Sequence, residues 1–216
     1  MFKKAFIFDV DGTLVDAYPA IVESFNYTMR RIGYPVEKAE KIKKAVGWGD
    51  IKLLEPFVER GDLDPAIRVY RAHHLKSLKR LSRLKPYAKS LLLYLRLKGI
   101  SLSIASNRPT RFTRVILKKL NIISFFDHIL CADKIKRGKP DPLILNLLAK
   151  KIGLNKKYIC YVGDMALDVK TGKSARIDTV AVATGSSSIP ELKKAGPVFL
   201  FKDLKALKRR LPYLTT

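Results

Sequence analysis

The sequence predicts an α/β fold in which a parallel sheet is covered on both faces by helices. From residue 87 onward, short apolar runs alternate with helical patterns, and such alternation with short turns favours a parallel sheet between two helical layers. A further apolar run at 4–9 cannot bury itself alone and must join that sheet. Residues 17–86 show no convincing strand. We therefore expect one α/β domain with a helical segment inserted near its N-terminus.

The expected elements follow from hydrophobic periodicity and from Gly and Pro positions. Helices of the inserted segment should end at Lys85-Pro86, because a helix is disfavoured directly before proline. They are expected at 17–32, 37–46, 50–60 and 65–84. Strands are expected at 4–9, 100–105, 128–131, 158–162, 179–183 and 197–200. The remaining helices are expected at 87–98, 109–120, 141–152, 166–176 and 203–210.

Length and hydropathy favour a cytoplasmic protein without a membrane partner. The 216 residues suffice for one α/β core plus a smaller insertion, and 47% of them are hydrophobic. No apolar run approaches the ~20 residues that cross a bilayer. The N-terminal residues run directly into the first strand instead of forming a signal peptide. Cys131 and Cys160 are expected to be reduced core thiols.

The net charge of +24, from 43 basic and 19 acidic residues, is unusual for a metabolic enzyme. Such a field attracts phosphorylated substrates and also holds nucleic acid non-specifically. The charge is spread, with 15 basic and 8 acidic residues in 17–86 and 28 basic and 11 acidic residues elsewhere. We therefore interpret it as a solvated surface, with specific nucleic-acid binding as the disfavoured alternative. One basic face lies on the helix expected at 65–84 and comprises Arg68, Arg71, Lys76, Lys79, Arg80 and Arg83.

Two carboxylates, Asp9 and Asp11, follow the first apolar run and precede Gly12 and Thr13. Because side chains alternate along a strand, residues at i and i+2 can face the same way at its end. Two carboxylates held together repel each other unless a cation or a shared proton separates them. The carboxyl end of a strand is where α/β folds place their ligands. This segment is therefore the first candidate site.

Three more segments place polar groups at the carboxyl ends of expected strands or at helix starts. Ser106-Asn107 follows a buried strand, where a hydroxyl and backbone amides can hold a phosphoryl oxygen. Lys139 precedes a helix start, which suits an anion. Asp164 and Asp168 share one face of a starting helix, so Asp168 can support Asp164.

The carboxyl ends of parallel strands meet at one edge of a sheet, so these groups should converge. Together they supply acids for a cation, and a serine and a lysine for an anion. Hard oxygen ligands suit Mg²⁺. The histidines His73, His74 and His128 show no metal-ligand spacing, and His74 is expected to pack on the apolar face of its helix.

The apolar strand followed by Asp-x-Asp-Gly-Thr, with the three other segments in the same order, resembles the haloacid dehalogenase-like hydrolases over essentially the whole chain. The resemblance implies a Rossmann-like catalytic core formed by residues 1–16 and 87–216. It also implies that residues 17–86 form a helical cap, as in the phosphoglycolate-phosphatase-like branch, which closes over the site. Gly47-Trp48-Gly49 is a candidate substrate-facing turn of that cap, and a plain interhelical turn is the alternative.

The resemblance also implies roles for individual residues. Asp9 would be the nucleophile that takes the phosphoryl group as an aspartyl-phosphate, and Asp11 would be the general acid and base. Asp9, the backbone carbonyl of Asp11, and Asp164 would bind Mg²⁺, with Asp168 supporting these ligands. The remaining expected site residues neutralise the phosphoryl charge or shape the phosphate-binding turn, and they are Thr13, Ser106, Asn107 and Lys139.

The function that the resemblance implies is a Mg²⁺-dependent phosphatase that acts on a small phosphorylated metabolite, with phosphoglycolate as the best candidate. Asp11 favours a phosphatase over a dehalogenase, because the dehalogenases of this family lack an acid at that position. A phosphomutase or pyrophosphatase of the same family, and a basic phosphatase of polynucleotide ends, stay open as alternatives. A phosphonate hydrolase would need a Schiff-base lysine in the cap, for which the candidates are Lys38, Lys41, Lys43, Lys44 and Lys52.

Overall fold

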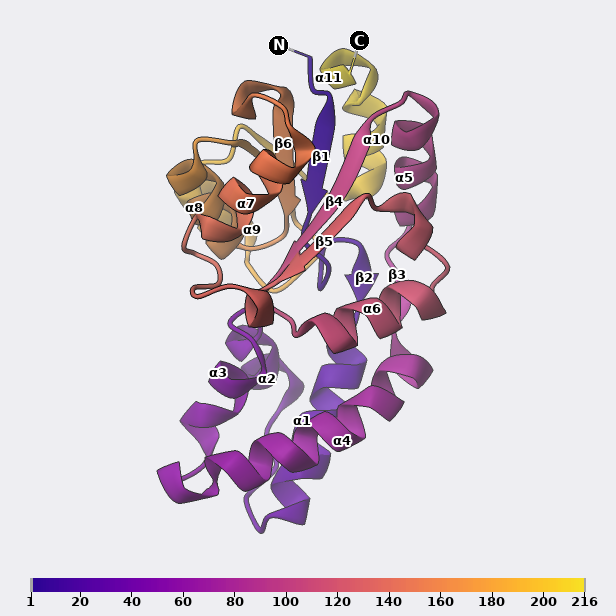
Figure 1. The fold of residues 1–216 in the computed structure, drawn as a ribbon. Coiled ribbons are helices and arrows are strands. Elements are labelled where there is room, and N and C mark those ends of the chain that lie inside the picture. The colour runs from indigo at the N-terminus through magenta and orange to yellow at the C-terminus, as the bar shows by residue number, and fades with distance from the viewer. Residues whose placement is uncertain (1, 216) are drawn as a thin grey trace.

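The computed structural model describes residues 2–215, and its centre is a parallel sheet of six strands in the order β5-β4-β1-β6-β7-β8 (Figure 1). Every neighbouring pair in this sheet is parallel. The predicted fold class is therefore confirmed. The strands are β1 (Ala5–Phe8), β4 (Ser101–Ser106), β5 (His128–Cys131), β6 (Ile159–Gly163), β7 (Asp178–Val182) and β8 (Phe199–Phe201).

Alternating side chains of β1 divide the core between the two faces of the sheet. Phe6 and Phe8 point to the face that packs against α5 (Ala88–Leu97), α6 (Thr110–Lys119) and α10 (Leu204–Arg210). Ala5 and Ile7 point to the opposite face. There the sheet packs against α7 (Leu143–Ile152), α8 (Ala166–Ala175) and α9 (Ile189–Ala195). Both faces of the sheet are thus covered by helices.

The register of the central strands places the predicted site segments side by side at the carboxyl edge of the sheet. Phe8, the last residue of β1, pairs with Ile104 of β4 and with Val162 of β6. Asp9 therefore lies beside the carboxyl ends of both neighbouring strands.

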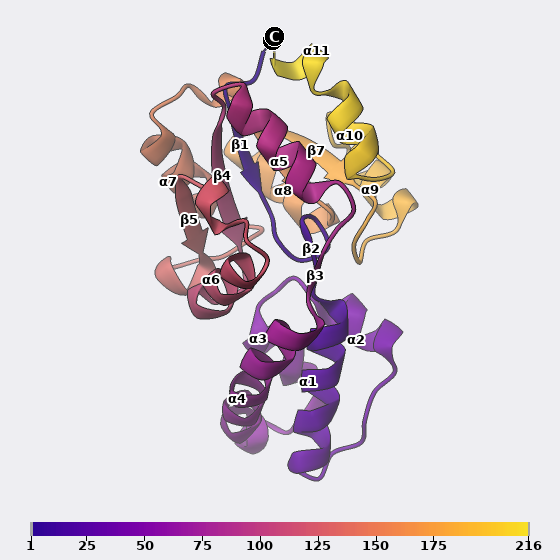
Figure 2. The same cartoon turned by 90° about the vertical axis from the view of Figure 1, so that its right-hand side faces the viewer.

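Residues 17–86, which we call the helical insertion, contain α1 (Tyr18–Arg31), α2 (Ala39–Ala45), α3 (Asp50–Leu54) and α4 (Leu63–Leu81). Figures 1 and 2 show this group of helices below the carboxyl ends of β1 and β4. The chain enters through β2 (Val15–Asp16) and returns through β3 (Arg83–Leu84), and the two pair antiparallel. A helical segment is therefore inserted as predicted, while the domain boundaries at 16/17 and 86/87 stay predictions.

Several element boundaries differ from those that the sequence predicted. The helix predicted at 50–60 stops at Leu54, and 3₁₀ turns at Glu55–Phe57 and Arg60–Asp62 follow it, because Pro56 cannot continue the helical hydrogen bonds. The helix predicted at 65–84 gives way to β3, whose partner β2 is distant in sequence. Two helices were not predicted, α9 and α11 (Pro212–Thr215).

Two further expectations can be compared with the structure. Cys131 and Cys160 are buried free thiols, as predicted. Within residues 2–215, no helix combines the length and apolar character needed to cross a bilayer.

Candidate active site

Asp9 follows β1 directly and is only 6% exposed. Its Oδ1 accepts a hydrogen bond of 2.6 Å from Nζ of Lys139. The same ammonium donates to Oδ1 of Asp168 at 2.7 Å and to the hydroxyl of Tyr161 at 3.1 Å. Tyr161 in turn donates to Asp168 at 2.6 Å. Lys139 is therefore fixed between two carboxylates at the end of the sheet, and Tyr161 is a supporting residue that the sequence did not indicate.

Asp9, Asp164 and Asp168 form a buried group in which one oxygen of each carboxylate lies within 4.8 Å of the others. Burial, only partly offset by Lys139, raises the pKa of Asp9 to about 7. Burial and the charge of Asp9 also hold the pKa of Asp164 well above its usual range. Three acids with one lysine lack enough positive charge, and a bound cation would relieve the repulsion. The all-oxygen donor set suits a hard divalent cation.

The backbone leaves no spare room around Asp164. A Cβ added to Gly185 would lie 1.5 Å from Oδ2 of Asp164, and one added to Gly12 would lie 2.4 Å from the same atom. Thr13 donates its hydroxyl to Oδ1 of Asp164 at 2.7 Å. Glycine is needed where backbone approaches another group this closely. Thr13, predicted among the phosphate-binding residues, therefore contacts Asp164 in the structure and does not line the cavity described below.

The side chain of Asn107 joins three segments of the site. Its Oδ1 accepts a hydrogen bond from the backbone N–H of Lys139 at 2.8 Å, and its Nδ2 donates to the carbonyl of Lys139 at 3.0 Å. Nδ2 also donates to the carbonyl of Gly47 at 2.8 Å. Ser106 ends β4 and accepts a hydrogen bond from the backbone N–H of Arg108 at 3.1 Å. Asn107 thus fixes the lysine loop against both β4 and the helical insertion.

Asp11 binds Arg108, a residue for which the sequence predicted no role. Both of its carboxylate oxygens accept hydrogen bonds of 2.7 Å from Arg108, one from Nε and one from Nη2. Arg108 is 8% exposed. Its position in the same loop as Ser106 and Asn107 was a signal that could have revealed it, because that loop was already expected at the carboxyl end of a strand.

His74 of α4 contacts Arg108 from the helical insertion. Its Nε2 lies 2.8 Å from Nη1 of Arg108, and its Nδ1 lies 3.0 Å from the hydroxyl of Ser24. Burial, and then the charge of Arg108, hold the pKa of His74 well below its usual value, so the ring is neutral. Ser24 donates its own proton to the carbonyl of Ala20 at 2.8 Å. Ser24 therefore accepts from Nδ1–H, which leaves Nε2 of His74 to accept from Arg108.

These groups surround a cavity of about 60 Å³ between the strand ends and the helical insertion. The predicted residues Asp9, Asp11, Ser106, Asn107 and Lys139 all line it, and Asp164 and Asp168 do not. The helical insertion contributes the apolar side chains Ile21, Val46 and Leu53, the aromatic Tyr70, and the polar His74 and Asp50.

The turn Gly47-Trp48-Gly49 reaches this cavity through its two glycines. Trp48 is 50% exposed and does not line the cavity. The turn therefore faces the site with its backbone and not with its aromatic side chain.

Known proteins resemble the chain along nearly its whole length. A phosphoglycolate phosphatase of Vibrio cholerae is 29% identical over 215 residues, which cover 94% of this chain and 95% of the relative. A crystal structure from Haemophilus somnus, described as a predicted phosphoglycolate phosphatase, has a TM-score of 0.90 at 25% identity and covers 96% of this chain and 97% of its own.

A haloacid dehalogenase-like family protein of Streptococcus pneumoniae, at 23% identity, shares the fold with a TM-score of 0.86 and covers 96% of this chain and 98% of its own. The family model of the haloacid dehalogenase-like hydrolases matches residues 6–182, which include β1 and the loops that follow β4 and β6. The chain therefore belongs to the haloacid dehalogenase-like hydrolases.

Proposed function

We propose that this protein is a Mg²⁺-dependent phosphatase that hydrolyses a small phosphate monoester through an aspartyl-phosphate on Asp9, with phosphoglycolate as the best candidate substrate. One observation carries the proposal: the carboxylate of Asp9 lines a small cavity and accepts a hydrogen bond of 2.6 Å from Lys139. Full-length similarity to phosphoglycolate phosphatases supports both the enzyme class and the substrate.

In the first step, an oxygen of Asp9 attacks phosphorus, and the bond between phosphorus and the leaving oxygen breaks. Asp11 donates a proton to that oxygen, so the alcohol leaves neutral. Ser106, the amide of Asn107, and Lys139 stabilise the charge on the other phosphoryl oxygens. The alcohol departs, and the phosphoryl group remains on Asp9 as an acyl phosphate.

In the second step, Asp11, now a carboxylate, takes a proton from a water molecule. The water oxygen attacks phosphorus, and the bond to Asp9 breaks. Inorganic phosphate leaves, and Asp9 and Asp11 return to their starting forms. The apolar lining from the helical insertion excludes other water during this cycle.

Asp9, Asp164 and the backbone carbonyl of Asp11 would hold the Mg²⁺ ion. When bound, it neutralises negative charge on the phosphoryl oxygens and on the buried acids. Asp168 contributes differently, because its Oδ1 accepts from Lys139 and Tyr161 and its Oδ2 accepts from the backbone N–H of Met165 at 3.1 Å. Both of its oxygens are thus engaged, and Asp168 positions Lys139.

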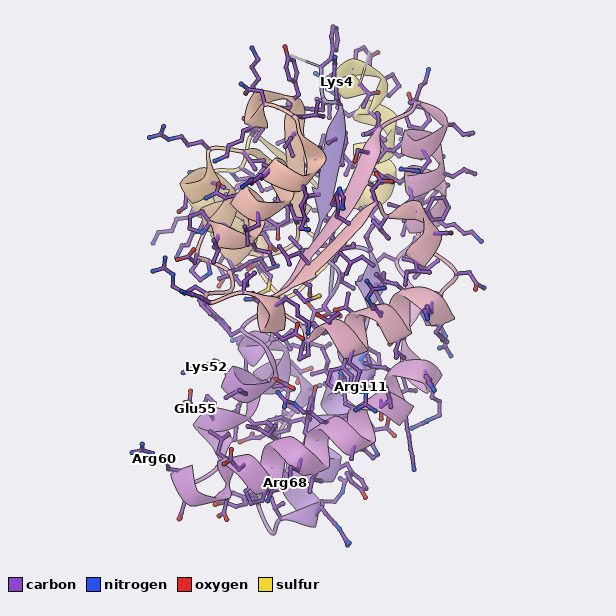
Figure 3. The ribbon with its side chains drawn as sticks, viewed as in Figure 1. Lys4, Lys52, Glu55, Arg60, Arg68 and Arg111 are labelled. Atoms are coloured by element: carbon purple, nitrogen blue, oxygen red, sulfur yellow. The ribbon has the colours of Figure 1, made fainter. Side chains whose placement is uncertain are left out.

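The cavity favours a small substrate. A volume of about 60 Å³ holds a few water molecules, which leaves little space for a nucleotide base while the helical insertion is in place. The helical insertion carries the basic residues Lys52, Arg60 and Arg68, which are labelled in Figure 3. They are exposed on its outer side and do not line the cavity. The positive surface is therefore best explained as a general attraction for anions.

A substrate screen tests the proposal. Phosphate release from the purified protein with Mg²⁺ is compared for phosphoglycolate, glucose 1-phosphate, pyrophosphate, a nucleoside monophosphate and a 5′-phosphorylated oligonucleotide. The highest kcat/KM is expected for phosphoglycolate. A highest value for the oligonucleotide would show a polynucleotide-end phosphatase. Conversion of the sugar phosphate to an isomer without phosphate release would show a phosphomutase.

A further inference from the structure

We infer that Arg108 recognises a carboxylate on the leaving group of the substrate and that His74 holds Arg108 in the orientation needed for this. The inference deepens the proposed function and rests on it, because only a phosphate monoester whose leaving oxygen meets Asp11 brings its leaving group to Arg108. Arg108, in a loop of the core, would thus determine specificity, and His74, in the helical insertion, would position Arg108.

The position of Arg108 follows from that of Asp11. A group that protonates the leaving oxygen must lie within hydrogen-bonding distance of it, at about 3 Å. Nε and Nη2 of Arg108 each lie 2.7 Å from a carboxylate oxygen of Asp11, and both residues line the cavity. The guanidinium is therefore adjacent to the atoms that extend from the leaving oxygen. In phosphoglycolate those atoms are one methylene group and a carboxylate.

Some N–H groups of Arg108 have no acceptor among the described residues. A guanidinium carries five N–H groups, and Arg108 uses one on His74 and two on Asp11. Among residues 2–215, no protein acceptor is found for the other two. Unsatisfied donors on a buried charge are costly. An anion in the cavity would satisfy them, and a planar carboxylate matches two N–H groups of a guanidinium.

The size of the cavity decides between two kinds of anion. Arginine binds a second phosphoryl group as well as a carboxylate, so pyrophosphate and phosphoglycolate share the necessary chemistry. A carboxylate is the smaller and flatter group, and the cavity measures about 60 Å³. Tyr70 and Phe112 also line the cavity, as does Asp50, whose carboxylate is paired with Arg71. We therefore commit to a carboxylate.

His74 contacts Nη1 of Arg108, while Nε and Nη2 of the same guanidinium bind Asp11. Its ring is stacked on Tyr70 at 4.7 Å between centroids and meets the edge of Phe112 at 5.2 Å. Ser24 fixes the tautomer, so Nε2 is held as an acceptor for Arg108. The charged side chain of the core is thus oriented by a neutral side chain of α4.

Two substrates of equal length separate recognition from chemistry. Phosphoglycolate and 2-hydroxyethyl phosphate differ only in whether the leaving group ends in a carboxylate or a hydroxymethyl group. The wild-type protein is expected to prefer phosphoglycolate by at least tenfold in kcat/KM. Arg108→Met should reduce this preference at least tenfold, and Arg108→Lys should reduce it nearly as much, because lysine lacks the planar pair of donors. The matched control is Arg111→Met, since Arg111 of α6 is exposed (Figure 3) and should leave the preference unchanged.

The role of His74 has its own readout. His74→Leu removes the acceptor for Arg108 and should raise KM for phosphoglycolate more than it lowers kcat. His74→Gln retains an acceptor and should restore most of the preference. A purely structural role for His74 would instead reduce turnover of both substrates equally in both variants.

Each outcome bears on a specific claim. If Arg108→Met lowers kcat/KM equally for both substrates, Arg108 only positions Asp11 and the inference is overturned. If Arg108→Met instead lowers kcat/KM for pyrophosphate selectively and leaves that for phosphoglycolate unchanged, the group recognised is phosphoryl and not carboxylate, which also overturns the inference. If the wild-type protein hydrolyses neither ester but releases phosphate from another monoester of the substrate screen, the inference is overturned and the proposed phosphatase activity stands. If it releases phosphate from no monoester, the proposed function itself fails.

Discussion

The side-chain amide of Asn107 donates a hydrogen bond of 2.8 Å to the backbone carbonyl of Gly47. Asn107 belongs to the loop after β4, and Gly47 belongs to the helical insertion. The same amide group also binds the carbonyl of Lys139. The side chain of Asn107 therefore contacts both the loop that carries Lys139 and the segment of the helical insertion that carries Gly47. A second contact of this kind joins Arg108 and His74. The core and the helical insertion are thus joined at the site by specific polar contacts as well as by apolar packing.

Replacing Asp9 with asparagine should abolish phosphate release while leaving the fold intact. An amide of nearly equal size cannot act as the nucleophile, so we expect kcat to fall at least about 1000-fold, or roughly 4 kcal/mol in the barrier. Steady-state kinetics together with circular dichroism test this. Turnover within tenfold of wild type would rule out Asp9 as the nucleophile.

Metal removal should stop the reaction, because the buried acids need a cation to bind a phosphate ester at all. EDTA is expected to eliminate turnover, and Mg²⁺ is expected to restore it. Asp164→Ala should raise the Mg²⁺ concentration for half-maximal activity by about tenfold or more, since one carboxylate ligand is lost. Full activity in the presence of chelator would contradict a metal-dependent mechanism.

Gly185→Ala should impair the enzyme through Asp164. The added Cβ would lie 1.5 Å from Oδ2 of that carboxylate, so either the loop or the acid must move. We expect at least a tenfold loss of kcat/KM and a higher Mg²⁺ requirement. Gly61→Ala is the matched control, because nothing lies within 4 Å of its added Cβ. Equal kinetics of the two variants would show that the tight contact at Gly185 is unimportant.

Without metal, the protein should become less stable as pH rises. Burial raises the pKa of Asp9 from its ordinary value of 3.8 to about 7 in the folded state, so the folded state binds the proton of Asp9 more tightly than the unfolded state does. The stabilisation is full below pH ~4 and is lost as pH rises through about 7. Asp164 acts in the same direction.

Thermal unfolding in EDTA at pH 5 and pH 8 measures this effect. The decrease in Tm should be smaller for Asp9→Asn, which cannot ionise, and adding Mg²⁺ at pH 8 should recover more stability in wild type than in that variant. An identical pH dependence for both proteins would contradict the raised pKa.

The basic face of α4 should steer anions without recognising nucleic acid. Arg80 binds Glu23 and Arg71 binds Asp50, so a test uses Arg68, Lys76 and Lys79, all exposed and without an ion pair among residues 2–215. Replacing all three with Gln should lower kcat/KM for a small ester only slightly, and added salt should act the same way. A selective loss above tenfold on 5′-phosphorylated oligonucleotides, about 1.4 kcal/mol, would instead support a polynucleotide substrate.

The sequence predicted the sheet and the family because both depend on local patterns. The central strands β1, β4 and β6 are short and largely apolar, and polar residues lie at or directly after their carboxyl ends, so the meeting of these residues at one edge could be inferred from topology. The family match confirms that inference about the class of hydrolase. The metal ion, the substrate and the individual residue roles stay proposals.

Contacts between distant segments could not be predicted in this way. His74 was expected only to pack, yet it also binds Arg108, because the angle at which α4 meets the core is set by the whole fold. The pairing of β2 with β3 was missed for the same reason, since two-residue strands carry no periodicity of their own. Thr13 likewise meets Asp164 through folding of the turn after β1.

A substitution of Asp168 would affect both the stability of the fold and the active site. Its Oδ2 accepts the backbone N–H of Met165 at the start of α8, while its Oδ1 receives Lys139 and Tyr161. The first contact stabilises a helix terminus, and the second orients a charged group of the active site. Polar active-site residues are commonly a burden on stability, so their removal often makes a protein more robust. At this position the two requirements coincide, and selection for a durable fold and selection for turnover would both retain the same carboxylate.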